Sequence, residues 1–464
     1  MPTLLHKNIA ALAVLGFALS ACDVAQIQQH LPVIPESWNS APAPAKTPEK
    51  AAAIQQTTVL SNWWKQFHDA QLDWLVDQSL KENPDVHQAS ARIDEARGMA
   101  KTSNAALYPQ ITANGDAARE RQLFLGPVTG NVYDASFDAS YELDLFGKNR
   151  EAAKAAELEA QAAGKDYDWV KLSLIAEVAR NYVTMRAAEK QISLAEKNLN
   201  IEKDTLSLVD RQRKAGGASS FDYERAALQV NQSAARIAEY KRQRENATLA
   251  LITLTGLDAK TLHQHLKAAH DIPGISLKAV ADAPASVLAR RPDIAAANAR
   301  FTEATSLKES QAAAVFPTIS LSGLFGLSKT LIVDTANVWS LGGNAAVSLL
   351  DFGRIQGQID AASAREVSAY EDWRKAILQG MQDVETALTN VTQLSQQRVA
   401  LGRAKENAAK AVSLAQDRYR AGDASLLDVL DAQRQLIDAD SALIDAEGNY
   451  VTAIVALYKA LGQY

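Results

Sequence analysis

Few residues of this chain have the types and spacing that catalysis or metal binding requires. His263, His265 and His270 cluster, but no second set of ligands stands at a spacing that would complete a zinc site, so we expect a surface loop there. No His-Glu-x-x-His occurs, and neither Gly147-Lys148-Asn149 nor Gly164-Lys165-Asp166 completes a phosphate loop. The sequence therefore predicts a protein that is not an enzyme and that has no cofactor and no metal.

The chemistry that the sequence does offer lies near its N-terminus. Lys7 gives a positive start, Ile9 to Leu19 forms an apolar run, and Leu19-Ser20-Ala21 leads directly into Cys22, the chain's single cysteine. This order resembles a bacterial lipobox, which implies cleavage before Cys22 and acylation of its thiol and amino groups, for example with palmitate. The apolar run is too short to span a bilayer of about 30 Å, so acyl chains would provide the tether. A plain signal peptide with an incidental cysteine is the alternative.

Asp23 bears on where such a lipoprotein would be sorted. In enteric bacteria an aspartate after the acylated cysteine tends to retain lipoproteins in the inner membrane, whereas other bacteria use different rules. The sequence therefore leaves open whether Asp23 affects membrane sorting in this organism.

The composition of the chain limits which secondary-structure elements it can form. The 464 residues are 47% hydrophobic, carry a formal net charge of −6, and include only 22 Gly and 13 Pro. An acidic chain is a poor candidate for binding nucleic acid, and low Gly and Pro content favours long uninterrupted elements. We predict a lipoprotein signal peptide over residues 1–21 and an acylated, proline-containing N-terminal tether over 22–60. No later run is apolar and long enough to predict a transmembrane helix.

The remainder of the chain, residues 61–464, repeats itself. Asn83-Pro84-Asp85-Val86 recurs as Arg291-Pro292-Asp293-Ile294, and Phe146-Gly147-Lys148 recurs as Phe352-Gly353-Arg354. Because such matches keep their order through both halves, we predict a duplicated module with a first repeat over 61–256 and a second over 285–464.

Each repeat contains a stretch of period-two alternation. From Tyr133 to Leu145 the odd residues are apolar and the even residues polar, which predicts a strand with one wet face. We expect β-hairpins at about 108–146 and 316–352, with strands long enough to cross a bilayer. A soluble sheet with one face on a core is the alternative. If the strands face lipid, the four strands of one chain are too few to close into a barrel, so several chains must share one barrel.

Long helices are predicted to bracket the strands. Asn149 to Lys214 contains no Pro and one Gly, and as one helix it would extend about 100 Å. Apolar residues recur every seven positions in it, which predicts a supercoiled seam; they are Val178, Met185, Ile192, Leu199 and Leu206. Ser220 or Asp222 is expected to cap the return helix, and Ser425 the corresponding helix of the second repeat.

Taken together, residues 61–464 resemble the outer-membrane factor family, the TolC-like channels of efflux and secretion systems. The motifs that carry the resemblance are Trp63-Trp64-Lys65-Gln66-Phe67, Asn83-Pro84-Asp85, Tyr108-Pro109 and Tyr141 to Lys148, with their second-half counterparts. With the lipobox, the lipoprotein subgroup that serves resistance-nodulation-division pumps is the most similar.

The resemblance implies both a fold and partners. It implies an α+β membrane protein in which a trimeric 12-stranded β-barrel, four strands per chain, continues into a long α-helical barrel. It also implies a passive exit duct in the outer membrane for drugs or other small molecules, which works with a periplasmic adaptor (membrane fusion) protein and an inner-membrane efflux pump. A large helical portion would lie in the periplasm.

The resemblance further implies a periplasmic gate. The segment from Tyr419 to Asp431 is similar to the family's gate segment, with Asp428 and Asp431 at its two aspartates and Tyr419 at a latch tyrosine. In a trimer the two carboxylates would form rings that favour cations. The alternative is that both are ordinary first-turn acids favoured by the helix dipole.

One position departs from the family's gate segment. Ala424 stands where the family has an arginine, so the usual latch ion pair is in doubt, and Arg418 or Arg420 is the candidate substitute.

Two other functions stay open at this point. One is a periplasmic lipoprotein adaptor or scaffold with coiled-coil hairpins and no pore, and the other is the exit duct of a type I secretion system. The transported substrates and the identity of the pump cannot be read from the sequence.

Overall fold

The computed structural model describes residues 31–40, 62–123, 127–266, 271–275 and 284–462. Two compact units are distinguished, Met1–Val33 and Ile34–Tyr464, and every described helix and strand lies in the second. Cys22 and the predicted signal peptide lie outside the described residues.

The first half of the larger unit leads from short helices through a β-hairpin into a long helical hairpin. Its elements are η1 (Trp63–Phe67), α3 (Ala70–Glu82), α4 (Pro84–Ala105), β1 (Gln110–Gln122), β2 (Val128–Leu143), α5 (Lys148–Lys214), α6 (Ser220–Thr255) and α7 (Ala259–His265). The first-turn position of Pro84 suits a residue without an amide hydrogen.

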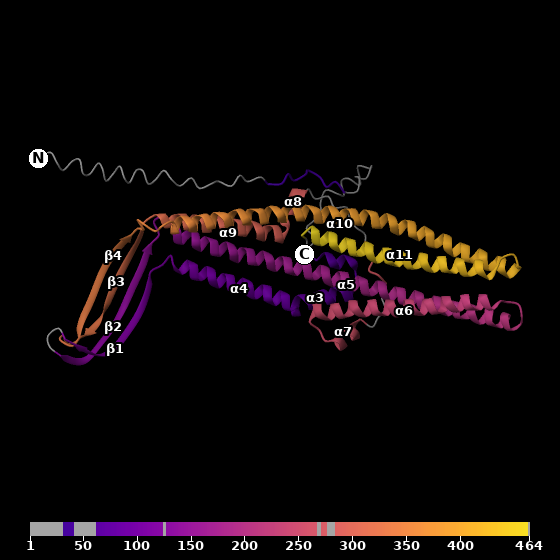
Figure 1. Ribbon diagram of the computed structural model, residues 1–464, viewed down its shortest axis with the longest axis horizontal. Helices are drawn as coiled ribbons and strands as arrows, with labels where there is room; N and C mark the ends of the chain where they lie inside the picture. Colours follow the sequence, from indigo (N-terminus) through magenta and orange to yellow (C-terminus); the bar gives the residue numbers. More distant parts are fainter. Residues whose placement is uncertain (1–30, 41–61, 124–126, 267–270, 276–283, 463–464) are drawn as a thin grey trace. The chain divides into compact units, whose positions relative to one another are not determined.

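The second half repeats this plan, again with a proline, Pro292, in the first turn of its shorter helix. Its elements are α8 (Pro284–Arg290), α9 (Pro292–Ala312), η2 (Ala313–Val315), β3 (Thr318–Lys329), β4 (Ala336–Ala346), α10 (Arg354–Ala421) and α11 (Leu426–Ala460). Long helices with one small antiparallel sheet confirm the predicted α+β class (Figure 1). Within the described ranges, no helix combines the length and the apolar character needed to cross a membrane.

The four strands form one antiparallel sheet in the order β1-β2-β3-β4. Its register aligns Ala113, Phe137, Phe325 and Trp339 in a row across the four strands. The three aromatic side chains of that row are 61%, 64% and 76% exposed, so one face of the sheet is an open apolar surface. Because side chains alternate along a strand, the neighbouring polar positions face the other way.

The strand β2 differs from the predicted Tyr133–Leu145 at both ends, and it stops two residues early, at Leu143. β2 begins at Val128 rather than Tyr133, because its pairing with β1 continues through Gly130 and Asn131 as far as Gln122 opposite Val128. By residue type alone, Gly130-Asn131 would belong to a turn, but the pairing with Glu120 and Arg119 extends the strand through both residues.

The hydrophobic core lies where α3, α5, α6 and α11 meet, midway along the long helices (Figure 1). Trp63 is fully buried there and stacks on Tyr458 at 5.1 Å between ring centroids. The two repeats use equivalent positions to hold the ends of their return helices. Asn83 donates to the Leu254 carbonyl, and Arg291 donates to the Ala460 carbonyl.

A short stretch of the predicted tether is packed against this region. Trp38 is 6% exposed and belongs to the core, and the backbone N–H groups of Asn39 and Ser40 donate to the Glu385 carboxylate of α10 at 2.7 and 2.9 Å. The proline-containing composition predicted an extended spacer and gave no sign of this attachment.

Candidate functional site at the ends of the helical hairpins

The two helical hairpins end in turns of the same build, at the ends of α5 and α10 that lie away from the sheet (Figure 1). α5 leads into α6 through Gly216, and α10 leads into α11 through Gly422, with φ of 79° and 84°. That left-handed conformation favours glycine, since a Cβ would strain it. Each tip is therefore a tight turn between two long helices.

The return helices then start with identical capping boxes. The Ser219 hydroxyl accepts from the Asp222 N–H, and the Ser425 hydroxyl accepts from the Asp428 N–H. The prediction of Ser425 as a cap is confirmed. The prediction of Ser220 is wrong, because the N-cap residue is Ser219, whereas Asp222 does take part in the cap, since its carboxylate accepts from the Ser219 N–H at 3.2 Å.

Asp428 is held by this cap and also faces solvent. Its Oδ2 accepts from the Ser425 N–H and from the Ser425 hydroxyl, both at 2.8 Å. These hydrogen bonds, helped by the charge of Arg418, lower the pKa of the Asp428 carboxyl group. The carboxylate is thus exposed and ionised at the tip.

Asp431 and Tyr419 have partners as well. The Asp431 carboxylate accepts from Arg434 at 2.5 Å and from Gln435 at 2.8 Å, both on its own helix. The Tyr419 hydroxyl donates to Gln212 Oε1 at 3.2 Å, which links α10 to α5. The structure therefore brings Asp428 and Asp431 onto the first turns of α11, and Tyr419 into a contact between the two hairpins.

Neither candidate substitute for the missing arginine at Ala424 makes an ion pair with these aspartates in this chain. Arg418 donates to the Asp423 carbonyl at 3.2 Å, and Arg420 pairs with Asp417 of its own helix at 3.3 Å. Among the described residues, Tyr419 is therefore the one of these three side chains that contacts the other hairpin.

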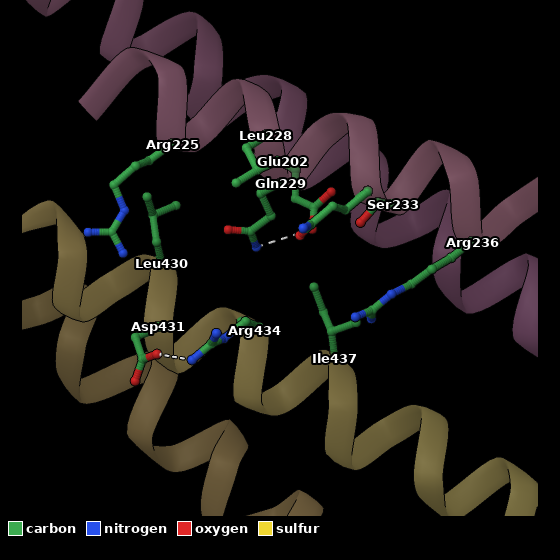
Figure 2. A pocket seen from close by; sticks show the side chains of 11 residues that line it. Glu202, Arg225, Leu228, Gln229, Ser233, Arg236, Leu430, Asp431, Arg434 and Ile437 are labelled. Carbon is green, nitrogen blue, oxygen red and sulfur yellow. Dashed lines mark hydrogen bonds and ion pairs between the residues drawn. The ribbon is translucent and has the colours of Figure 1, made fainter. Parts of the chain in front are cut away.

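A cavity of about 180 Å³ lies between the hairpins beside Asp431. Figure 2 shows its two walls, with Glu202, Gln229, Ser233 and Arg236 on the α5–α6 side and Asp431 with Arg434 on α11. The side chains of its walls come from α5, α6 and α11. Charged groups of both signs therefore line a space between the two helical hairpins.

Glu202 is the residue of this site that the sequence analysis missed. It is 4% exposed, Gln229 donates to its Oε1 at 3.2 Å, and its Oε2 has no hydrogen-bond partner among the described residues. Burial raises the pKa of its carboxyl group, against weaker opposing effects of Ser233, Gln229 and Arg236. A buried carboxyl group with a free oxygen is costly, so it needs a partner or a proton.

The predicted seven-residue seam explains why Glu202 was overlooked. Val178 and Met185 of that seam are buried, but towards the tip Leu199 and Leu206 are only half-buried. The buried positions there are three residues further on, and they again recur every seven residues; they are Ala195, Glu202 and Val209. A charged residue in a buried seven-residue row is the signal that would have found it.

Polar contacts continue between the hairpins beyond this cavity. Arg236 of α6 pairs with Asp438 of α11 at 3.1 Å, and Tyr240 of α6 meets the Ser441 hydroxyl of α11 at 3.0 Å. The hairpins are therefore joined by an ion pair and a hydrogen bond between side chains in this region.

The other residues singled out by type are not assembled into a site. His265 of α7 stacks on Trp74 at 4.0 Å, His263 lies on the same short helix, and His270 lies outside the described residues. In the part of the chain that the structure describes, no group of three or more His, Cys, Asp or Glu residues is placed to hold a metal ion.

Comparison with known proteins identifies the family. The family model described as outer membrane efflux protein matches residues 75–257 and 283–463, which together are most of the chain. The chain belongs to the outer membrane efflux protein family. Its assignment to this family confirms the resemblance found in the sequence.

Individual relatives of this outer membrane efflux protein match over nearly full length. It is 30% identical over 462 residues to the pyoverdine export outer membrane protein OpmQ of Pseudomonas putida, covering 97% of this chain and 96% of that protein. It is 30% identical over 472 residues to the outer membrane protein OprJ of Pseudomonas aeruginosa, covering 98% and 95%. Among solved structures, the outer-membrane channel OprN is similar with a TM-score of 0.84 and 29% identity, covering 94% of this chain and 99% of that one.

Proposed function

We propose that three copies of this chain share one 12-stranded barrel and form the exit duct of a tripartite efflux system. The observation that carries this proposal is the sheet, in which β1 and β4 each pair on one side only. An unpaired row of N–H and C=O groups in hydrocarbon costs several kcal/mol per group, so the open edges need partners. Three four-stranded sheets closed in a ring satisfy every edge.

The two faces of the sheet support the same arrangement. The row that contains Phe137, Phe325 and Trp339 would face lipid, and the opposite face would line a water-filled duct. That opposite face carries polar side chains such as Thr112, which pairs with Asp138. The helices would continue the duct as an α-helical barrel in the periplasm.

We infer the partners from the relatives. OpmQ is named for pyoverdine export, and other relatives are named for toluene efflux and antibiotic efflux. We therefore propose a passive exit duct for small molecules that works with a periplasmic adaptor protein and an inner-membrane pump of the resistance-nodulation-division type. A pump upstream would supply the energy, since a duct of this kind needs no catalytic group of its own.

We also propose that Cys22 is acylated and anchors the mature chain to the outer membrane. The support is the order of residues before Cys22 in the sequence, followed by the packing of Trp38 against the helical core. An acylated N-terminus would then lead into a point of attachment on α10. Residues 1–21 would be removed as a signal peptide.

The two repeats, residues 61–256 and 285–464, are proposed to be two copies of one module.

The periplasmic gate is proposed at the tips of α10 and α11. The exposed, ionised Asp428 and the neighbouring Asp431 would form two rings of carboxylates in a trimer, and Tyr419 would hold α10 to α5 through Gln212. The Asp428 carboxylate also takes part in the capping box. Asp428 can therefore be both a first-turn capping residue and part of the proposed gate.

Single-channel recording in planar bilayers tests the duct and the gate together. We expect the purified protein to conduct, and we expect Asp428→Asn with Asp431→Asn to raise the conductance and to weaken block by multivalent cations. Ser425→Ala is the matched control, because it loosens the same cap without removing a charge. Absence of any conductance would refute the duct, whereas equal currents and equal block in the double variant and in the parent would refute the gate alone.

A further inference from the structure

The cavity between the hairpins contains one group that the proposed gate does not use. Glu202 is buried on α5, its Oε2 makes no hydrogen bond among the described residues, and its side chain lines the cavity together with that of Ser233, whose hydroxyl group favours the ionised form only weakly (Figure 2). A carboxylate in such a place is stabilised only by a cation or by strong donors. The present arrangement therefore suits the protonated form of Glu202.

Two arginines on α6 and one on α11 line the same cavity. Arg225 lies over the Phe221 ring at 5.5 Å. The pKa of the Asp222 carboxyl group is lowered mainly by the hydrogen bonds from Ser219, and the charge of Arg225 adds to this effect. Arg434 is paired with Asp431 on its own helix at 2.5 Å, so both move together.

Arg236 differs from both, because its partner belongs to the other hairpin. Its guanidinium group pairs with Asp438 of α11 at 3.1 Å, with both side chains about half exposed. It also lines the cavity that Glu202 lines, and its charge already acts on Glu202. Any separation of α11 from α6 would take Asp438 away and leave Arg236 without that partner, in the cavity that Glu202 also lines.

We propose that Glu202 is the second acceptor of Arg236. When the α10–α11 hairpin draws away from the α5–α6 hairpin, the Arg236 guanidinium group exchanges Asp438 for the free oxygen of Glu202. The Glu202 carboxyl group gives up its proton to water in the cavity as the new ion pair forms. This inference rests on the proposed function, since it treats movement of the hairpins as the opening of the gate.

The exchange has a consequence for the balance between the two states. Without Glu202, opening would lose an interhelical ion pair and gain nothing in return. With Glu202, one ion pair replaces another, and a proton is released in the step. Opening is therefore favoured as the pH rises, and Glu202 acts as a positioning residue rather than as a lining group of the duct. The other charged groups that line its cavity are Arg225 and Arg236 on α6, and Asp431 and Arg434 on α11, and of these Arg236 acts on the charge of Glu202.

Single-channel recording of the full-length protein between about pH 5.5 and pH 8.5 tests the exchange. We expect the open probability of the parent protein to rise with pH, and we expect Glu202→Gln to lower it roughly threefold at pH 8, the ratio that an ion pair of ordinary strength gives. The variant should also lose the pH dependence. Gln keeps the shape of Glu and can still meet Gln229, so folding and assembly should be retained.

Two further variants make the test specific. Glu196→Gln removes an exposed carboxylate of α5 that pairs with Lys241, and it should leave the pH profile unchanged. In an Arg236→Gln background, Glu202→Gln should have no further effect, because the donor is already absent. A conducting Glu202→Gln variant with the parent's pH profile would overturn this inference alone. A parent protein that does not conduct would overturn the proposed duct, and this inference with it.

Discussion

Replacing Arg291, the residue directly before α9, should destabilise the protein far more than replacing Arg300 within that helix. Its side chain is 1% exposed, and its guanidinium group donates to Asp293 at 2.7 Å, to Asp383 at 2.9 Å and to the Ala460 carbonyl at 3.1 Å. Arg291→Gln would leave two carboxylates without their cation and the end of α11 without its donor. Breaking a buried pair from one side costs about 3–5 kcal/mol.

Arg300 provides the matched control on α9. It also pairs with two carboxylates, those of Asp166 and Glu159, but its side chain is 42% exposed. An exposed pair is screened by water, so Arg300→Gln should cost at most about 1 kcal/mol.

The two costs convert into different shifts of the midpoint of thermal unfolding. With an unfolding entropy of about 2 cal/mol/K per residue, a chain of 464 residues loses roughly 1 °C per kcal/mol. Thermal unfolding in detergent at one scan rate should therefore show a fall of about 3–5 °C for Arg291→Gln and about 1 °C or less for Arg300→Gln. Equal shifts for the two variants would refute the argument from burial. Adding Asp383→Asn to Arg291→Gln should cost less than the sum of the two single changes, because they share one ion pair.

Three other outcomes follow from the structure. Trp38→Ala should lower the free energy of unfolding by about 3–5 kcal/mol and should expose the chain around residue 38 to limited proteolysis. Trp38→Phe should have a smaller effect on both. Equal digestion of the parent protein and the two variants would contradict the observed packing. Burial and the nearby charge of Glu159 raise the pKa of the Glu303 carboxyl group from 4.5 to about 7. Between these two pH values Glu303 holds a proton in the folded protein and has lost it in the unfolded chain. The free energy of unfolding should therefore fall as the pH rises from about 4.5 past 7. Glu303→Gln should remove that part of the fall in a pH series of unfolding midpoints, and an unchanged slope would contradict the assignment. If Phe325 faces lipid, Phe325→Arg should make the free energy of assembly in the membrane less favourable by about 2–4 kcal/mol. Ser322→Arg, on the opposite face of the sheet, should assemble normally in a detergent-resistance assay. Equal impairment of the two variants would contradict the assignment of the two faces.

Much of the fold could be predicted because its signals are periodic. Alternation from Tyr133 to Leu145 marks a strand, and the absence of proline from Asn149 to Lys214 marks a helix that the structure shows as Lys148–Lys214. Such patterns depend on the direction of side chains along one element, and the chain itself records that direction. Boundaries that depend on a partner are different, which is why β2 extends five residues beyond its predicted start.

The parts that could not be predicted depend on contacts between distant segments. The attachment of residues 38–40 to α10 requires Glu385, more than three hundred residues away along the chain. The buried position of Glu202 depends on which of two adjacent helix stripes faces the neighbouring helices, and a straight helix drifts relative to a seven-residue repeat. Residue type therefore identified the aspartates at the tip, and only the fold revealed the carboxyl group behind them.

The most direct test of the account is whether the outer edges of β1 and β4 meet in neighbouring subunits. Cysteines would be placed along β1 at positions 112–118 and along β4 at positions 338–344, one of each per variant, and oxidised in isolated outer membranes. A subset of pairs should produce covalent dimers and trimers and no larger species, because three sheets close one ring. Cross-links that form only within single chains, or chains that never cross-link at any pair, would contradict the claim that three subunits share one wall.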